Sequence, residues 1–326
     1  LEKNNISCVV SESPSIMSTS VLWVICKKLG IHFISFSNWG INGRIMSNTS
    51  WGSGLDSFED KLTKLTVNKS SDSYIKSIEY LCKMEEKLEH PSYVNTDLDT
   101  GKKFKDKSAP VKFPKTTITD FVRFSYKVKH LNERYYMNST NRLKSYYLWA
   151  QSLLKINLLR LYSPLKKDLD LSAERYFLFP LHILNEWTDY SLMGLKYPSI
   201  LKVIESCAAC LPIDCKLYVK EHPSNFGEKK FSFYSAVKKI RNVRLIAHDE
   251  ESSSLIRQSE GVITLGSTMG WEAFLLGKTV IVLTDIWYKD FPGVYKSKGS
   301  EHLAQLLQDS ANLPIASEEE KLKALY

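Results

Sequence analysis

Short apolar runs and amphipathic stretches alternate along the second half of the chain. The apolar runs lie at residues 176–180, 216–220, 243–246, 261–265 and 280–283. Runs of this length suit strands that are buried on both faces, as the strands of a parallel sheet are. The stretches between them, such as 200–211 and 251–257, have the spacing of helices. The alternation therefore predicts a second parallel α/β domain, which ends in a helical region at 300–326.

The first half shows this pattern once. Residues 6–10 and 31–36 are apolar, and between them 21–29 has helical spacing and ends at Gly30. This βαβ unit implies a parallel sheet covered by helices. Two clear strands are few for a complete sheet, so we expect the N-terminal domain to be incomplete.

The rest of the first half gives weaker signals. Residues 37–56 are rich in Gly, Asn and Ser and predict a loop, and 57–90 predict helix. Residues 95–116 are polar and basic, which indicates either a solvated linker or a patch for an anionic glycan or membrane surface. Composition changes near Ser163-Pro164, so we divide the chain into domains at 1–165 and 172–326.

Net charge indicates the kind of partner, and cysteine usage indicates the cellular compartment. The formal net charge is +8, which favours anionic partners. We expect no nucleic acid, because no zinc-finger, RNP-type or helix-turn-helix pattern occurs. The six cysteines are scattered and predict free thiols in a reducing compartment. No apolar run reaches the roughly 18 residues of a membrane span, so we expect a cytoplasmic protein.

The unit from Leu265 to Asp285 carries the most informative chemistry. Gly266 and Gly270 flank Ser267 and Thr268 after a predicted strand, a helix follows, and Gly277 ends it. Such a loop places free backbone N–H groups, two hydroxyls and the positive end of a helix dipole at one point, which suits a phosphate. An ordinary tight turn with a capping Ser or Thr has the same pattern. Glu272, one turn into the helix, lies where it can accept hydrogen bonds from a ribose.

Three predicted loops follow strands of the second domain, at 180–187, 221–226 and 266–272. The carboxyl ends of parallel strands meet at one edge of the sheet, where ligands of open α/β sheets bind. His222 can donate a hydrogen bond to a phosphate oxygen there, and as an imidazolium it can stabilise charge on a leaving phosphate. Lys220 is close in sequence, but its side chain can point to the other sheet face.

Four motifs together resemble the capsule polysaccharide biosynthesis proteins, which include bacterial Kdo transferases and are related in motif to bacterial sialyltransferases. The motifs are Tyr-Phe-Leu-Phe-Pro-Leu-His (176–182), Lys-Glu-His-Pro (220–223), Gly-Ser-Thr-Met-Gly-Trp-Glu-Ala (266–273) and Gly-Lys-Thr-Val-Ile (277–281). The resemblance implies a GT-B architecture, in which two Rossmann-like domains face a cleft. Residues 1–165 would be the acceptor side and 172–326 the donor-binding domain.

The resemblance also implies roles for individual residues. His222 would contact the donor phosphate, Ser267 and Thr268 would bind the same phosphate, and Glu272 the ribose. The full set that we expect at the donor is Lys220, His222, Pro223, Gly266, Ser267, Thr268, Glu272, His182 and Glu186. Glu186 matches a Glu of the family, but its neighbours Leu184-Asn185-Glu186-Trp187-Thr188 differ from the Pro-Glu-Ala-Ser-like segment of many relatives.

We expect inverting sugar transfer from a nucleotide-sugar donor, with CMP-linked Kdo or sialic acid favoured, to a glycan or glycolipid acceptor. Glu12 follows a predicted strand in the first domain and is our candidate general base, although it is also placed to cap the following helix. No Asp-x-Asp triplet lies at a strand end, so we expect no metal and no other cofactor. Peripheral association with the inner face of the membrane or with an assembly complex is a further expectation.

Two other functions fit the same residues. A CDP-polyol phosphotransferase of teichoic-acid type also carries a His-Pro and a Ser/Thr-rich loop before a helix, but the Gly-x-x-x-Gly-x-Glu-Ala pattern from Gly266 favours a sugar transferase. A non-catalytic nucleotide-binding scaffold in a polysaccharide-assembly complex would keep the pocket and lack a base.

Overall fold

The computed structural model describes residues 6–12, 17–38, 45–48, 62, 64–86, 174–182, 199–222, 229–247 and 250–326. The predictions for the basic segment 95–116, for Glu186 and for Pro223 lie outside these residues, as does the boundary near Ser163-Pro164.

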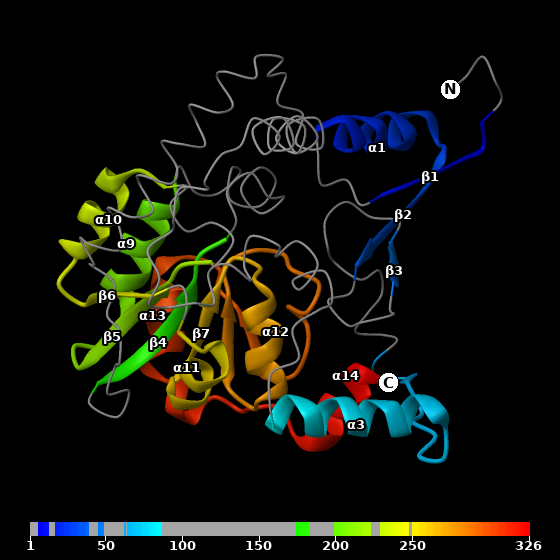
Figure 1. The fold of residues 1–326 in the computed structure, drawn as a ribbon. Helices are drawn as coiled ribbons and strands as arrows, with labels where there is room; N and C mark the ends of the chain where they lie inside the picture. The colour runs from blue at the N-terminus through cyan, green and yellow to red at the C-terminus, as the bar shows by residue number, and fades with distance from the viewer. Residues whose placement is uncertain are drawn as a thin grey trace, which may run out of the picture.

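The described part of the first half contains a small sheet with a helix beside it (Figure 1). Its elements are β1 (Cys8–Glu12), α1 (Met17–Leu29), β2 (His32–Asn38) and β3 (Ile45–Asn48). β1 and β2 pair in parallel, which confirms the predicted βαβ unit, while β2 and β3 pair antiparallel. The loop prediction for 37–56 was therefore wrong at β3. This strand pairs Asn48 with Ser35 and Ile45 with Asn38, and its four residues are too few to show a periodic pattern in the sequence.

The second half forms a six-stranded sheet in the order β6-β5-β4-β7-β8-β9, in which each pair of neighbouring strands is parallel. The strands are β4 (Arg175–Pro180), β5 (Cys215–Lys220), β6 (Val243–Ile246), β7 (Gly261–Thr264), β8 (Thr279–Val282) and β9 (Val294–Lys296). The predicted parallel α/β fold is confirmed. β9 was not predicted, since a three-residue strand gives no periodic signal.

Helices cover both faces of this sheet, and each face has its own core. The helices are α9 (Ile200–Cys210), α10 (Phe231–Lys238), α11 (Ser252–Gln258), α12 (Thr268–Leu275), α13 (Ser300–Gln308) and α14 (Glu318–Leu325), with a 3₁₀ turn at Ser310–Asn312. On β4, Phe177 and Phe179 enter the core beneath α9, α10 and α13, whereas Tyr176 and Leu178 enter the core beneath α11, α12 and α14. Alternating side chains along each strand thus supply both cores, as expected for a sheet buried on both faces.

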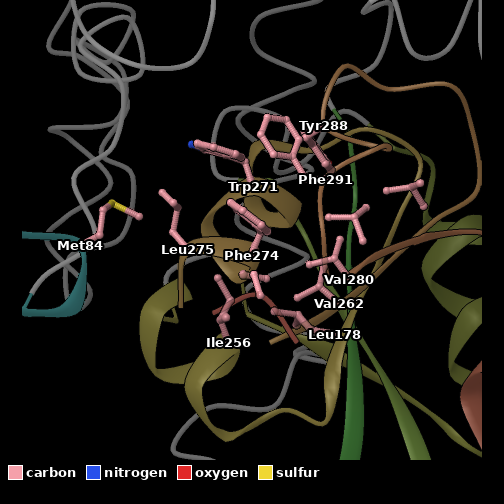
Figure 2. Close-up of a cluster of buried hydrophobic side chains, with 14 of the residues drawn as sticks. Met84, Leu178, Ile256, Val262, Trp271, Phe274, Leu275, Val280, Tyr288 and Phe291 are labelled. Atoms are coloured by element: carbon pink, nitrogen blue, oxygen red, sulfur yellow. The ribbon is translucent and has the colours of Figure 1, made fainter. Parts of the chain in front are cut away.

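The second core joins distant parts of the sequence. Figure 2 shows Trp271, Phe274 and Phe291 close together over the strand residues, with Met84 at the edge of the cluster. The rings of Trp271 and Phe274 stack with centroids 5.1 Å apart, and Phe274 lies 5.4 Å from Phe291. Apolar burial and aromatic contacts of this kind fix the orientation of α12 on the sheet.

Met84 belongs to α3 (Asp72–Glu86), which precedes the sheet by some distance in sequence. α3 lies beside α14 (Figure 1), and its Leu81 and Met84 are buried in the second core. The guanidinium of Arg257 on α11 donates to the backbone carbonyls of Met84 (3.3 Å) and Glu85 at the end of α3. A helix from the range 1–165 therefore packs on the second sheet; the domain boundaries themselves remain a prediction.

The helix prediction for 57–90 holds over α3, whereas 65–68 are not helical. No helix within the described ranges is long and apolar enough to cross a membrane.

Candidate functional site

The candidate site lies at the carboxyl edge of the second sheet. β5, β4 and β7 are neighbours, with Pro180 paired to Lys220 and Leu178 paired to Val262. The first residues after these strands therefore start from one edge of the sheet. This arrangement brings together the segments that carry His182, His222 and Ser267, as the sequence predicted.

His222 stands next to a buried ion pair. The carboxylate of Glu221 accepts hydrogen bonds from Lys229 Nζ (2.9 Å), from the Tyr234 hydroxyl (2.8 Å) and from the backbone amide of His222 (3.1 Å). Glu221 and Tyr234 are fully buried and Lys229 is 6% exposed, whereas His222 is only partly buried. The end of β5 thus combines a hydrogen-bonded backbone amide with a partly exposed imidazole.

His182 follows β4 and is buried, with 8% of the residue exposed. Burial, together with smaller contributions from the nearby positive charges of His222 and Lys229, lowers its pKa to about 4. His182 is therefore neutral near pH 7, so it can take part in hydrogen bonds at this edge without adding a charge.

Lys220 is buried as well, at 3% exposed. Tyr218 and Lys220 are two residues apart on β5, and Tyr218 packs in the core beneath α12, so Lys220 lies on that face of the strand. Glu221, by contrast, bonds to Tyr234 of α10 on the opposite face. Lys220 and Glu221 therefore act on different sides of the sheet.

The loop between β7 and α12 is stabilised by its own hydroxyls. Thr264 Oγ1 accepts hydrogen bonds from the amides of Gly266 (3.0 Å) and Ser267 (2.9 Å), and Ser267 Oγ caps α12 by accepting from the amide of Met269 (3.2 Å). The expectation that this loop offers free backbone N–H groups was wrong for these three amides. The reason is that two short hydroxyl side chains bond to nearby backbone amides: Thr264, the last residue of β7, accepts from two of them, and Ser267 accepts from the third.

Thr268 is the residue of this loop that faces solvent. It is exposed at the first position of α12, where helix amides have no intrahelical acceptor. Within the described part of the chain, neither its amide nor its hydroxyl makes a hydrogen bond. The N-terminus of α12 thus presents one amide and one hydroxyl, together with the positive end of the helix dipole.

Gly270 allows α12 to approach Tyr288. A Cβ on Gly270 would lie 2.4 Å from the Tyr288 hydroxyl oxygen, and that hydroxyl donates to the backbone carbonyl of Ser267 at 2.6 Å. Burial raises the pKa of Tyr288 above its usual range, so it remains a hydrogen-bond donor. Gly270 thus has a packing role, and Tyr288 anchors the loop through its hydrogen bond to the Ser267 carbonyl.

Glu272 lies one turn into α12 and is 4% exposed. Its charge contributes to the raised pKa of Tyr288, which places the two side chains near each other. Its predicted contact with a ribose remains a prediction.

Glu12 is the last residue of β1, at the carboxyl end of that strand as predicted. Pro223 and Glu186 lie outside the described residues, and among the residues described no three His, Cys, Asp or Glu side chains form a potential metal site. Independence of metals and cofactors stays a prediction.

A sequence model described as capsule polysaccharide biosynthesis protein matches residues 89–319, which is more than half of the chain. The chain belongs to this family. The matched range contains the whole six-stranded sheet and the three strand ends described above. Comparison of the chain with curated protein sequences gives no match.

Solved structures with similar folds have low sequence identity to the chain. The beta Kdo 2,4 transferase of Thermosulfurimonas dismutans KpsC is 11% identical with a TM-score of 0.48, over 97% of this chain and 78% of that one. The beta Kdo 2,7 transferase of the same KpsC is 17% identical with a TM-score of 0.33, over 54% and 51%. A UDP-GlcNAc 2-epimerase from Methanocaldococcus jannaschii is 16% identical with a TM-score of 0.34, over 53% of each chain.

Sequence reasoning about this capsule-family protein missed Glu221, Lys229, Tyr234 and Thr264. Glu221 stands inside the recognised Lys-Glu-His-Pro motif, and a charged residue that continues a buried strand was a usable signal. Lys229 and Tyr234 gave no such signal, because α10 was not predicted and their partner lies eight or more residues away.

Proposed function

We propose that the protein is a glycosyltransferase of bacterial capsule or surface polysaccharide synthesis. It would transfer a sugar from a nucleotide-sugar donor to a glycan or glycolipid acceptor at the cytoplasmic face of the membrane. The observation that supports this most directly is the carboxyl edge of the second sheet in a member of the capsule family, where His222 follows β5 and Thr268 begins α12 after β7.

The donor phosphate would bind at this edge. The exposed amide and hydroxyl of Thr268 and the dipole of α12 favour an anion, and the His222 imidazole can donate to a second phosphate oxygen. His182, which follows the neighbouring strand β4 and is neutral near pH 7, can orient a ligand without adding charge. We favour a CMP-linked sugar such as Kdo or sialic acid, because the motifs resemble those of enzymes that use such donors.

Transfer would proceed in one displacement with inversion at the anomeric carbon. The acceptor hydroxyl oxygen forms the new bond to that carbon while the bond from carbon to the donor phosphate oxygen breaks. A carboxylate of the first domain, for which Glu12 is the candidate, takes the acceptor proton, and the nucleotide leaves with the bonding electrons. His222 and the α12 N-terminus stabilise the charge that develops on the leaving phosphate, so no metal is required in this scheme.

Thermal-shift titration with CMP, CDP, UDP and GDP tests donor binding. A nucleotide that binds only the folded protein raises Tm with concentration, by a stabilisation of about 2.7 kcal/mol at 100 times Kd. We expect stabilisation by CMP that His222→Ala weakens strongly. Stabilisation by UDP or GDP alone would replace the CMP assignment, and no stabilisation by any of the four would contradict a nucleotide-sugar transferase.

Product analysis then tests the reaction. We expect a glycosidic product and free nucleotide in the presence of EDTA, and Glu12→Gln should reduce kcat by at least about 10²-fold with donor binding unchanged. A product containing a phosphodiester would instead identify a polyol phosphotransferase. Activity that EDTA abolishes and Mn²⁺ restores would contradict the metal-independent scheme.

A further inference from the structure

The proposed transfer leaves the buried ion pair at the end of β5 without a role. Glu221 and Lys229 have side chains that are 0% and 5% exposed, and their charged atoms lie 2.9 Å apart. The desolvation of two charges offsets most of their attraction, so a buried pair is a poor way to stabilise a core. A local purpose beyond general stability is therefore the better explanation.

The position of Glu221 suggests that purpose. Its Oε1 accepts one hydrogen bond from Lys229 Nζ and another, at 3.1 Å, from the backbone amide of the next residue, His222. Its Oε2 accepts a hydrogen bond from the hydroxyl of Tyr234 on α10 at 2.8 Å. The carboxylate is thus held from two sides by side chains, and in turn it holds the backbone at the point where His222 begins.

We propose that Glu221 is a positioning residue for His222. The carboxylate, fixed by Lys229 and Tyr234, orients the His222 backbone so that the imidazole meets the donor phosphate, and this proposal rests on the proposed function. Orientation matters at this point, because a displacement of about 1 Å of a reacting group can reduce the rate about 10²-fold.

Matched double variants separate the hydrogen bond from the charge. Glu221→Gln with Lys229→Met removes both charges, and the glutamine oxygen keeps an acceptor for the His222 amide. Glu221→Leu with Lys229→Met removes the charges and the acceptor at nearly the same volume. Neither variant leaves an unpaired buried charge, so both are expected to fold. Lys202→Met with Glu205→Gln removes an exposed ion pair, with a 2.6 Å separation, as the control.

Kinetics give the first readout. We expect the Leu double variant to have a kcat roughly 10- to 100-fold below that of the Gln double variant, with a much smaller difference in the donor KM, because His222 acts on charge that develops during transfer. In a His222→Ala background the same comparison should show almost no difference, since the residue through which Glu221 acts is absent. Equal kcat values for the two double variants, or a full loss that persists without His222, would overturn the proposal.

Amide hydrogen exchange gives a readout that needs no activity. The His222 amide should be protected in the wild type and in the Gln double variant, and should exchange at least tenfold faster in the Leu double variant. If the amide is unprotected in the wild type, Glu221 does not hold it and the proposal fails. Protection together with no transfer from any nucleotide sugar would contradict the proposed function, while the contact between Glu221 and His222 would stand.

Discussion

The two sheets of this protein differ in how their strands are covered. In the second sheet Phe177, Leu178 and Phe179 are each at most 1% exposed, because helices pack on both faces. In the first sheet Val10 and Phe36 are 63% and 44% exposed. Parallel strands need cover on both faces to bury their side chains. The comparison indicates that the second sheet provides most of the stability of the described chain, and that the edge where we propose donor binding is therefore built on a well-packed base.

Core truncation should show this difference most strongly. Phe179→Ala, in the second sheet, should lower the free energy of unfolding by about 3–5 kcal/mol, from lost burial and the cavity that remains. Phe36→Ala, in the first sheet, should cost less than about 1 kcal/mol, since the side chain is 44% exposed. Urea unfolding followed by circular dichroism measures both. Equal losses would contradict the comparison.

The docking of α3 extends the second core, and Met84 tests it. Met84→Ala should cost about 2–4 kcal/mol, because this side chain is fully buried between α3 and the second sheet. Ile75→Ala on the same helix is the control, with an expected effect below about 1 kcal/mol at 50% exposure. If both variants lose the same stability in urea unfolding, α3 does not depend on this core.

The second sheet should also make stability depend on pH. His182 has a folded pKa of about 4, below the value of about 6.5 in unfolded chains, so the unfolded state binds more protons between these values. Stability is then fully present above about pH 6.5 and falls by up to about 3 kcal/mol as pH drops to about 4. Denaturant titrations at pH 7.5, 6, 5 and 4 should show this loss, and His182→Gln should remove it. Parallel curves for the two proteins would exclude His182 as the cause.

The smallest expected effect concerns the end of α3. Arg257→Met removes the guanidinium that donates to the carbonyls of Met84 and Glu85, and should cost about 1–2 kcal/mol. Arg257→Lys keeps a cation near the helix carboxyl end and should lose about half as much. Hydrogen exchange of the last α3 amides, measured in the same samples, should be faster in the Met variant than in the Lys variant. Unchanged exchange would show that the contact contributes nothing to docking.

Local sequence determined much of the second sheet. Apolar runs predicted β4 to β8 within one or two residues, and β6 at 243–246 was predicted at both ends. Gly277 was predicted to end α12, and it adopts a φ of +68°, a conformation that favours glycine. These features depend on residues that are close in sequence, so the pattern of side chains contains the necessary information. The meeting of three strand ends followed from the parallel sheet that the pattern implied.

Tertiary structure decided the rest. Only the fold shows that the Thr264 hydroxyl accepts hydrogen bonds from two amides of the glycine loop, and that Thr268 is the exposed residue of this loop. Only the fold brings Lys229 and Tyr234 to Glu221, and Met84 to a core whose next described member along the chain, Tyr176, lies 92 residues later. The physical reason is that a side chain's partner depends on the direction in which packing points it, and that direction is not contained in the spacing of the sequence.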